Sequence, residues 1–135
     1  MSDTLKLEVV TPERQVLSER VAEVQFPTAE RGYYGVLPGH TPVMTAVGDG
    51  LLSYVKDGLK HSLTVFGGFA EVGPDRLTLL ARASETVDMI DIDRVETARR
   101  RAEQRLAEHK ADTDMDRARF ALTRALVRLQ AKKEG

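Results

Sequence analysis

The chain has 135 residues, of which 41% are hydrophobic, and its 20 basic and 21 acidic residues leave a formal net charge of −1. This length suits one ordinary domain with a small addition, and the hydrophobic content argues against wholesale disorder. Because the chain has no cysteine, disulfide bonds and thiolate metal sites are excluded. The first ten residues lack the apolar stretch of a signal peptide, and no apolar run approaches the roughly 18 residues of a membrane-spanning helix. We therefore expect a soluble protein that reaches a membrane only through a partner.

The first half of the chain predicts short strands. Leu5, Leu7 and Val9 alternate with charged residues, as in a half-buried strand, and residues 21–27 predict a second strand that ends at a proline. Residues 51–66 predict a hairpin around Asp57-Gly58, a dipeptide typical of type I′ turns. Another hairpin is expected over residues 69–81, with its turn at Gly73-Pro74-Asp75. Turn signals recur every 8 to 12 residues or so, which favours a β-sandwich or a small barrel.

The second half predicts two helices, because proline is absent after residue 76 and Ala, Arg, Glu and Leu dominate from about residue 88. The first helix is expected to begin at Asp91, whose carboxylate can cap free backbone N–H groups. The second is expected from about residue 115 to 133, capped by Asp112 or Asp114. The predicted apolar face of the first helix comprises Val95, Ala98, Ala102 and Leu106, and that of the second comprises Ala118, Leu122, Ala125, Leu126 and Leu129. These small faces bury little area, so we expect a hairpin that docks weakly on the β half.

The second predicted helix is strongly basic. After Asp116 it has no acidic residue until Glu134. Arg117, Arg124 and Arg128 are offset by 7 and 11 positions, so at 100° per residue they point within about 20° of one another. Such a row suits an anion, whether a polyphosphate, an acidic helix or a nucleic acid, although a solvated helix face is the simpler interpretation.

Signatures of catalysis are missing from the sequence. It contains neither a GxxxxGK[ST] phosphate loop nor a GxSxG motif, and its three histidines are scattered. We therefore expect neither independent catalysis nor a metal site.

Four segments together resemble a known family: GYYGVLPGHTPVMTAV, VFGGFAEV, LTLLARASE and DIDRVETARRRAEQRLAE. They are similar to the epsilon subunit of bacterial F-type ATP synthases, the counterpart of the mitochondrial delta subunit. The resemblance implies an α+β fold, in which a ten-stranded antiparallel β-sandwich over residues 1–87 precedes an antiparallel two-helix hairpin over residues 88–135. It also implies a non-catalytic rotor subunit of the central stalk, at the cytoplasmic face of the cell membrane, in a proton-translocating complex. The sandwich would bind the gamma subunit and the c ring, and the hairpin would be regulatory.

The family resemblance also implies a regulatory ATP site, with no cofactor required. Several members bind ATP through an I/L-D-x-x-R-A motif, which residues 90–95 match except that Val95 replaces the alanine. The implied ATP-binding residues are Glu85, Ile90, Asp91, Arg94, Arg117, Arg124 and Arg128.

Partner contacts follow from the same resemblance. Tyr33, Tyr34 and His40 are the expected contacts with the c ring, although His40 could instead satisfy loop carbonyls. With the hairpin extended, Arg119, Arg124 and Arg128 would face the acidic region of a beta subunit, beside alpha, and block ATP hydrolysis. Two alternatives stay open at this point. One is a nucleic-acid-binding module, which the near-neutral charge and the lack of aromatic residues among the basic ones disfavour. The other is a free-standing ATP-sensing protein.

Overall fold

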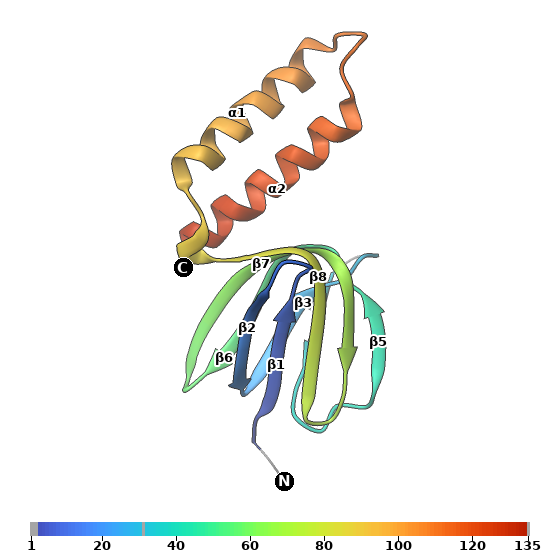
Figure 1. Cartoon of the computed structure of the whole chain (residues 1–135), viewed down its shortest axis with the longest axis vertical. Coiled ribbons are helices and arrows are strands. Elements are labelled where there is room, and N and C mark those ends of the chain that lie inside the picture. Colours follow the sequence, from blue (N-terminus) through green and yellow to red (C-terminus); the bar gives the residue numbers. More distant parts are fainter. Residues whose placement is uncertain (1–2, 31, 135) are drawn as a thin grey trace.

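A computed structural model describes residues 3–30 and 32–134, and Figure 1 shows a body of strands with a pair of helices at one end. The strands are β1 (Leu5–Val10), β2 (Gln15–Val21), β3 (Glu23–Pro27), β4 (Tyr33–Val36), β5 (Val43–Ala46), β6 (Asp49–Lys56), β7 (Leu59–Val72) and β8 (Arg76–Thr86). A single 3-10 turn, η1 (Val87–Met89), leads to the helices α1 (Ile92–Glu108) and α2 (Met115–Glu134).

The two longest strands, β7 and β8, run through both layers of the sandwich. The first part of β7 pairs with β6 and its last four residues pair with β5. The change of partner falls at Gly67 and Gly68, whose φ angles of 64° and 113° favour glycine. The first layer contains β2, β1, β8, β7 and β5, and the second contains β8, β7, β6, β3 and β4. Counting β7 and β8 in both layers accounts for the ten strands that the resemblance implies.

The predicted β-sandwich followed by a helical hairpin is confirmed, with two differences in the strands. The pairing of β1 with β8 is parallel, whereas every other pairing between named strands is antiparallel. The predicted strand at 21–27 is divided, because Val21 ends β2 and Glu23 begins β3. The chain passes between the layers there, and the amide of Ala22 donates to the carbonyl of Val55 at 2.7 Å.

The core lies between the two layers. Leu5, Leu7 and Val9 are all fully buried, as their alternation predicted. Where β2 and β6 approach without a backbone ladder, the Lys56 Nζ lies 2.5 Å from the Glu19 carboxylate. This ion pair, which we call the clasp, links β2 of the first layer to β6 of the second. It lowers the pKa of Glu19, chiefly through the hydrogen bond that Lys56 donates.

The helix caps follow the sequence prediction. Asp91 accepts hydrogen bonds from the backbone amides of Asp93 and Arg94, at 3.1 and 3.2 Å, directly before α1. Of the two candidate caps for α2, Asp114 accepts from the amide of Arg117 at 3.0 Å. Both helices therefore begin where a carboxylate satisfies free N–H groups.

The apolar faces of the helices are narrower than predicted. Ala102 of α1 and Ala118 and Ala125 of α2 are buried, whereas Ala98 and Leu126 are exposed, so the prediction was wrong for these two. The hairpin meets the sandwich in one apolar cluster, in which Leu51 of β6 lies with Ile90, with Val95 near the start of α1 and with Ala125 and Ala131 of α2. The remaining length of the hairpin projects away from the strands (Figure 1). Leu126 of α2 is 49% exposed.

Candidate functional site

The joint between hairpin and sandwich is held by an arginine on α2. The Arg128 Nε donates to the Glu85 carboxylate of β8 at 2.6 Å, and the two side chains are 26% and 25% exposed. The Arg128 guanidinium also lies over the ring of Phe66 on β7, 5.0 Å from its centroid. One side chain thus joins three elements, and its partial burial strengthens both interactions relative to a pair in open water.

Beside this ion pair lies a hollow of about 380 Å³, which we call the joint site. Its walls are Glu85, Met89, Asp91, Arg94, Val95, Ala98, Ala125 and Arg128. Glu85 and Arg128 are already paired, and Asp91 is fixed by its capping bonds to α1. Within the described part of the chain, Arg94 forms no ion pair. The joint site therefore combines two carboxylates with two guanidinium groups, one of which is available to an anion.

The structure brings together four of the seven implied ATP-binding residues, namely Glu85, Asp91, Arg94 and Arg128. Ile90 is buried in the docking cluster with Leu51 and does not line the joint site. Arg124 is half-buried one turn from Arg128, outside the wall of the hollow.

The other two arginines of α2 that the sequence singled out lie toward the far end of the hairpin. Arg117 lines a separate hollow of about 470 Å³ with residues of the loop between the helices, including Asp112 and Asp114. Arg119 is exposed and pairs within its own helix with Asp116, at 2.7 Å.

The three predicted c-ring contacts do not form one surface. Tyr33 is 56% exposed, whereas Tyr34 turns toward the core and stacks on Phe26 with ring centroids 5.6 Å apart. His40 Nδ1 lies 2.6 Å from the carbonyl oxygen of Thr41, so this nitrogen carries the proton, since a carbonyl can only accept. The hydrogen bond agrees with the alternative prediction that His40 satisfies a loop carbonyl. The Tyr34 hydroxyl lies 3.4 Å from the other ring nitrogen.

An exposed apolar surface on the first layer was missed by sequence reasoning. Ala46, Phe69, Leu80 and Val10 stand opposite one another across β5, β7, β8 and β1. We call these four residues the apolar row. Phe69 and Leu80 are 59% and 54% exposed, and the row borders a hollow of about 680 Å³. The alternation of side chains along a strand could have revealed this surface. Phe69 and Glu71 are two residues apart on β7, so they point to the same face, and the charge of Glu71 indicates that this face is exposed.

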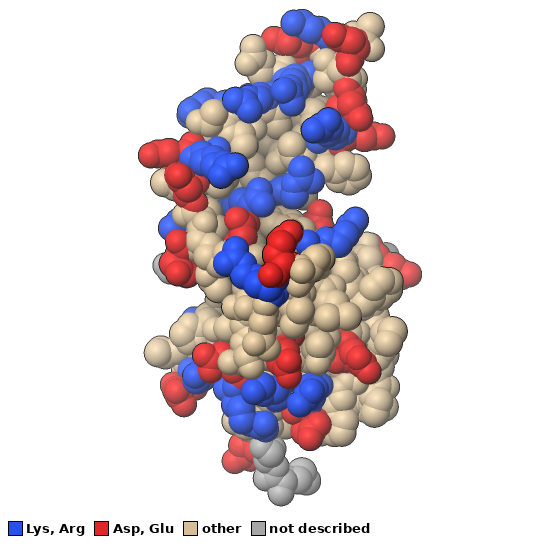
Figure 2. All heavy atoms as spheres, viewed as in Figure 1, with Lys and Arg blue, Asp and Glu red and all other residues tan. Residues whose placement is uncertain are grey.

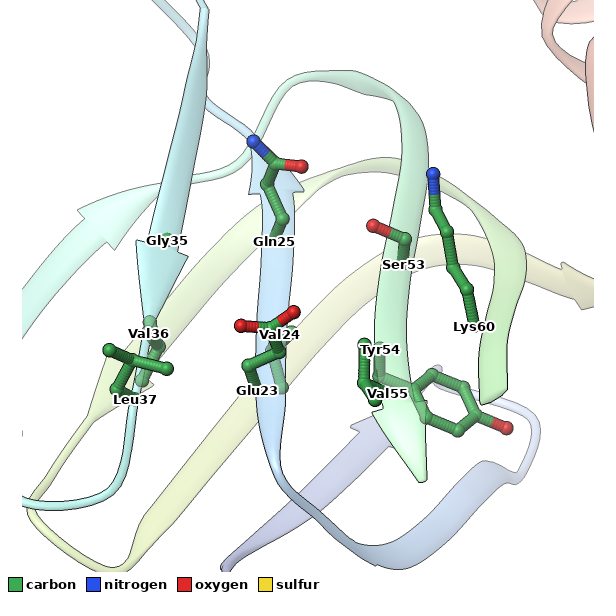
Figure 3. A pocket seen from close by; sticks show the side chains of 10 residues that line it. All are labelled: Glu23, Val24, Gln25, Gly35, Val36, Leu37, Ser53, Tyr54, Val55 and Lys60. Atoms are coloured by element: carbon green, nitrogen blue, oxygen red, sulfur yellow. The ribbon is translucent and has the colours of Figure 1, made fainter. Parts of the chain in front are cut away.

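The outer face of the second layer is more polar. Figure 3 shows a hollow of about 490 Å³ between β4, β3, β6 and the start of β7, where Gln25 and Ser53 are neighbours in register and Lys60 stands at one side. Gly35 leaves space on β4, because a Cβ there would meet nothing within 4 Å.

Figure 2 shows Lys and Arg gathered over the hairpin together with acidic groups, and a largely uncharged area over the sandwich on the side of β5.

Comparison with known proteins matches both halves of the chain. Residues 4–87 match the family described as ATP synthase, Delta/Epsilon chain, beta-sandwich domain, and residues 88–133 match its long alpha-helix domain. The chain is 47% identical over 132 residues to the ATP synthase epsilon chain of Nitratidesulfovibrio vulgaris, covering 98% of each. It is 44% identical over 134 residues to that of Syntrophobacter fumaroxidans, covering 99% of each.

Solved structures show the same fold. A chain in the cryo-EM structure of the Euglena gracilis mitochondrial ATP synthase aligns with a TM-score of 0.80 at 22% identity, covering 97% of this chain and 82% of that one. At this identity the likeness concerns the fold alone. The two domains match in the predicted order over nearly the full length, and the predicted resemblance is confirmed: this chain belongs to the family of ATP synthase delta/epsilon chains, which are non-catalytic subunits of that enzyme.

Proposed function

We propose that this chain is a central-stalk rotor subunit of a proton-translocating F-type ATP synthase, and that its helical hairpin restrains ATP hydrolysis. The nearly full-length family match carries the proposal. Residues 1–87 form the coupling part and residues 88–135 the regulatory part. No helix in the described residues is long and apolar enough to cross a bilayer. We place the chain at the cytoplasmic face of the cell membrane, held there by the other subunits.

The sandwich supplies the surfaces for the rotor partners. The apolar row is the surface that we assign to the gamma subunit, because Phe69 and Leu80 expose large side chains that a partner would cover. Of the three residues predicted for the c ring, we assign the direct contact to Tyr33, which is 56% exposed, whereas Tyr34 and His40 are partly buried, lie against each other and would support this end of the sandwich.

The hairpin is docked on the sandwich through few contacts, as expected of an element that can be released from it. It meets the sandwich at one end, through a small apolar cluster that includes residues of α1 and α2 and through the Arg128–Glu85 ion pair. Large side chains contribute about 1.5–3 kcal/mol each when fully buried, and alanines contribute much less, so the docking energy is modest. In the released state Arg119, Arg124 and Arg128 would face acidic surfaces of the beta and alpha subunits.

ATP at the joint site would favour the docked state. Its phosphates would pair with Arg94 and compete with Glu85 for Arg128, since phosphate and carboxylate both suit a guanidinium fork. A ligand at a hundred times its dissociation constant adds about 2.7 kcal/mol to the state that binds it. That amount is comparable with the docking energy, so a regulatory ligand could decide the conformation without serving as a cofactor.

Reconstitution of the complex tests the inhibitory role. A chain that ends at residue 87 should assemble, and ATP hydrolysis by the complex should exceed that with the full chain because the hairpin is gone. Equal hydrolysis with both chains at every ATP concentration would count against inhibition. Loss of assembly with the full chain present would count against the rotor assignment.

Calorimetric titration of the full chain tests the ATP site. Arg94→Ala should abolish most of the binding heat, because its guanidinium lines the joint site without an ion-pair partner among the described residues. Arg124→Ala should lower the binding heat less than Arg94→Ala does, because Arg124 lies outside the wall of the joint site. Arg119→Ala is the matched control, because Arg119 pairs with Asp116 outside the site. Equal heats for all four proteins would remove ATP from the proposal.

A further inference from the structure

The outer surface of the first layer carries one charge that the proposed function leaves unexplained. Arg82 follows Leu80 by two residues on β8, so both side chains point to the same outer face. Among the described residues that line the 680 Å³ hollow beside the apolar row, Arg82 is the only charged one.

The guanidinium of Arg82 occupies space that is free only because residue 67 is a glycine, and we call this space the seat of Arg82. Gly67 stands opposite Arg82 in the ladder between β7 and β8, between the pairs Phe66–Ala83 and Gly68–Ala81. A Cβ on Gly67 would lie 2.5 Å from Nε and 2.7 Å from Cζ of Arg82. The guanidinium therefore lies against the Gly67 backbone, in space that any larger residue would occupy.

The seated guanidinium has no ion-pair partner in the described part of the chain. Arg82 is exposed, as is Arg76 at the other end of β8, but the Arg76 guanidinium lies 3.6 Å from the Glu8 carboxylate. Covering an unpaired guanidinium with apolar groups would cost free energy. A partner that covers the apolar row must therefore offer Arg82 an acceptor or tolerate that cost.

We propose that Arg82 is a specificity residue for the partner on this face, and that it binds a carboxylate of that partner beside an apolar contact with Phe69 and Leu80. The inference rests on the proposed function, in which this partner is the gamma subunit. A planar guanidinium can donate two parallel hydrogen bonds to one carboxylate, which fixes the register of the contact.

The test measures affinity between the full chain and a catalytic complex that contains gamma but lacks this chain. Arg82→Ala should weaken binding at least about 30-fold, the lower range for removing one partner of a buried charge pair. Arg82→Glu should weaken binding further, because it places two like charges together. Arg76→Ala, on the same strand and face, is the control and should change affinity by less than about 3-fold, as expected for an exposed ion pair.

Gly67→Ala tests the seat itself. The new methyl group displaces the flexible end of Arg82, so binding should weaken about 10-fold while thermal melting shows a folded protein. Combining Gly67→Ala with Arg82→Ala should give no loss beyond that of Arg82→Ala alone, because both changes remove the same contact. Additive losses would contradict a shared contact.

Leu80→Asp separates failure of this inference from failure of the proposed function. Leu80 is more than half exposed, so the change leaves the core intact. If Leu80→Asp binds like the wild-type chain, the apolar row is not the gamma surface and that assignment falls. If Leu80→Asp abolishes binding while Arg82→Ala binds as tightly as wild type or more tightly, the partner offers no carboxylate and the inference about Arg82 is wrong.

Discussion

At the scale of single residues, Arg128 shows how one side chain can decide the position of a whole element. Periodicity identified its direction on α2, but its partners Glu85 and Phe66 lie far away in sequence and could not be predicted. The same periodicity grouped Arg117 with Arg128, although 11 residues of helix separate them by about 16 Å along the axis. A helical wheel gives the direction of a side chain but not its neighbours along the axis.

Arg128→Ala should loosen the hairpin without loosening the sandwich. The change removes a half-buried ion pair and a cation–π contact, which together are worth about 1–2 kcal/mol. We expect the amides of α1 and α2 to exchange hydrogen faster, by the factor that corresponds to this free energy, about 5- to 30-fold. Exchange in β1 and β8 should be unchanged. Arg128→Lys should be intermediate, because a lysine keeps the charge but loses the planar fork. Arg119→Ala, which removes only a pair within the helix, should leave hairpin exchange near the wild-type rate.

At the scale of elements, local signals were predicted well and long-range pairings were not. Asp57 and Gly58 have φ angles of 52° and 76°, in keeping with the predicted type I′ turn, and Asp91 caps its helix as expected. These features depend on a few neighbouring residues. The parallel pairing of β1 with β8 joins residues about 70 positions apart, and no local pattern encodes it. Strand β2 is different: it forms a local hairpin with β1, in which Val10 pairs with Gln15, and the prediction missed it.

The bend in β7 predicts a sharp contrast between two glycine substitutions. A Cβ on Gly68 would fall within 2.8 Å of the Leu80 carbonyl carbon, in the backbone of the neighbouring strand, and its φ of 113° is also unfavourable for alanine. Gly68→Ala should therefore destabilise the protein by roughly 3 kcal/mol or more, measured by denaturant unfolding. Gly35→Ala is the control, because a Cβ there meets nothing within 4 Å, and it should change stability by less than about 0.5 kcal/mol. Equal stability of the two variants would contradict the close approach at the bend.

At the scale of the whole molecule, two layers enclose one core and the helices add a second, smaller cluster at its edge. The order of the two parts and their types were predictable from composition, because glycine and proline occur almost only in the first part. The place where the parts meet was not predictable, since it depends on which exposed side chains of the sandwich the end of α2 covers. The joint site is therefore a property of the assembled molecule.

The clasp between the layers gives a pH dependence to the stability of the whole molecule. The Lys56 hydrogen bond lowers the pKa of Glu19 from its ordinary value near 4.5, and the same bond raises the pKa of Lys56 from near 10.5. A lowered carboxyl pKa contributes stability above about pH 4.5 that is lost as pH falls through the folded value. A raised lysine pKa contributes stability below about pH 10.5 that is lost as pH rises through its folded value.

We expect Glu19→Gln to lower the melting temperature at neutral pH and to match the wild-type chain in acid, once Glu19 is protonated in both states. Melting curves from pH 2 to 7 or so would show the two proteins converging as pH falls. Glu23→Gln, which removes an exposed carboxylate without an ion pair in the described residues, should leave the curve nearly unchanged. A constant difference between Glu19→Gln and wild type across this range would contradict the clasp.

The hairpin is attached at one end only, and α2 is 20 residues long, or about 30 Å. It is therefore a lever whose pivot lies at Arg128 and whose tip is the loop between the helices. From Arg128 to Met115 the helix runs for 13 residues, or about 20 Å, so by simple trigonometry a tilt of about 15° at the pivot swings the tip through about 5 Å, roughly one helical pitch. A displacement too small to disturb the strands is thus amplified into one large enough to change what the tip can touch.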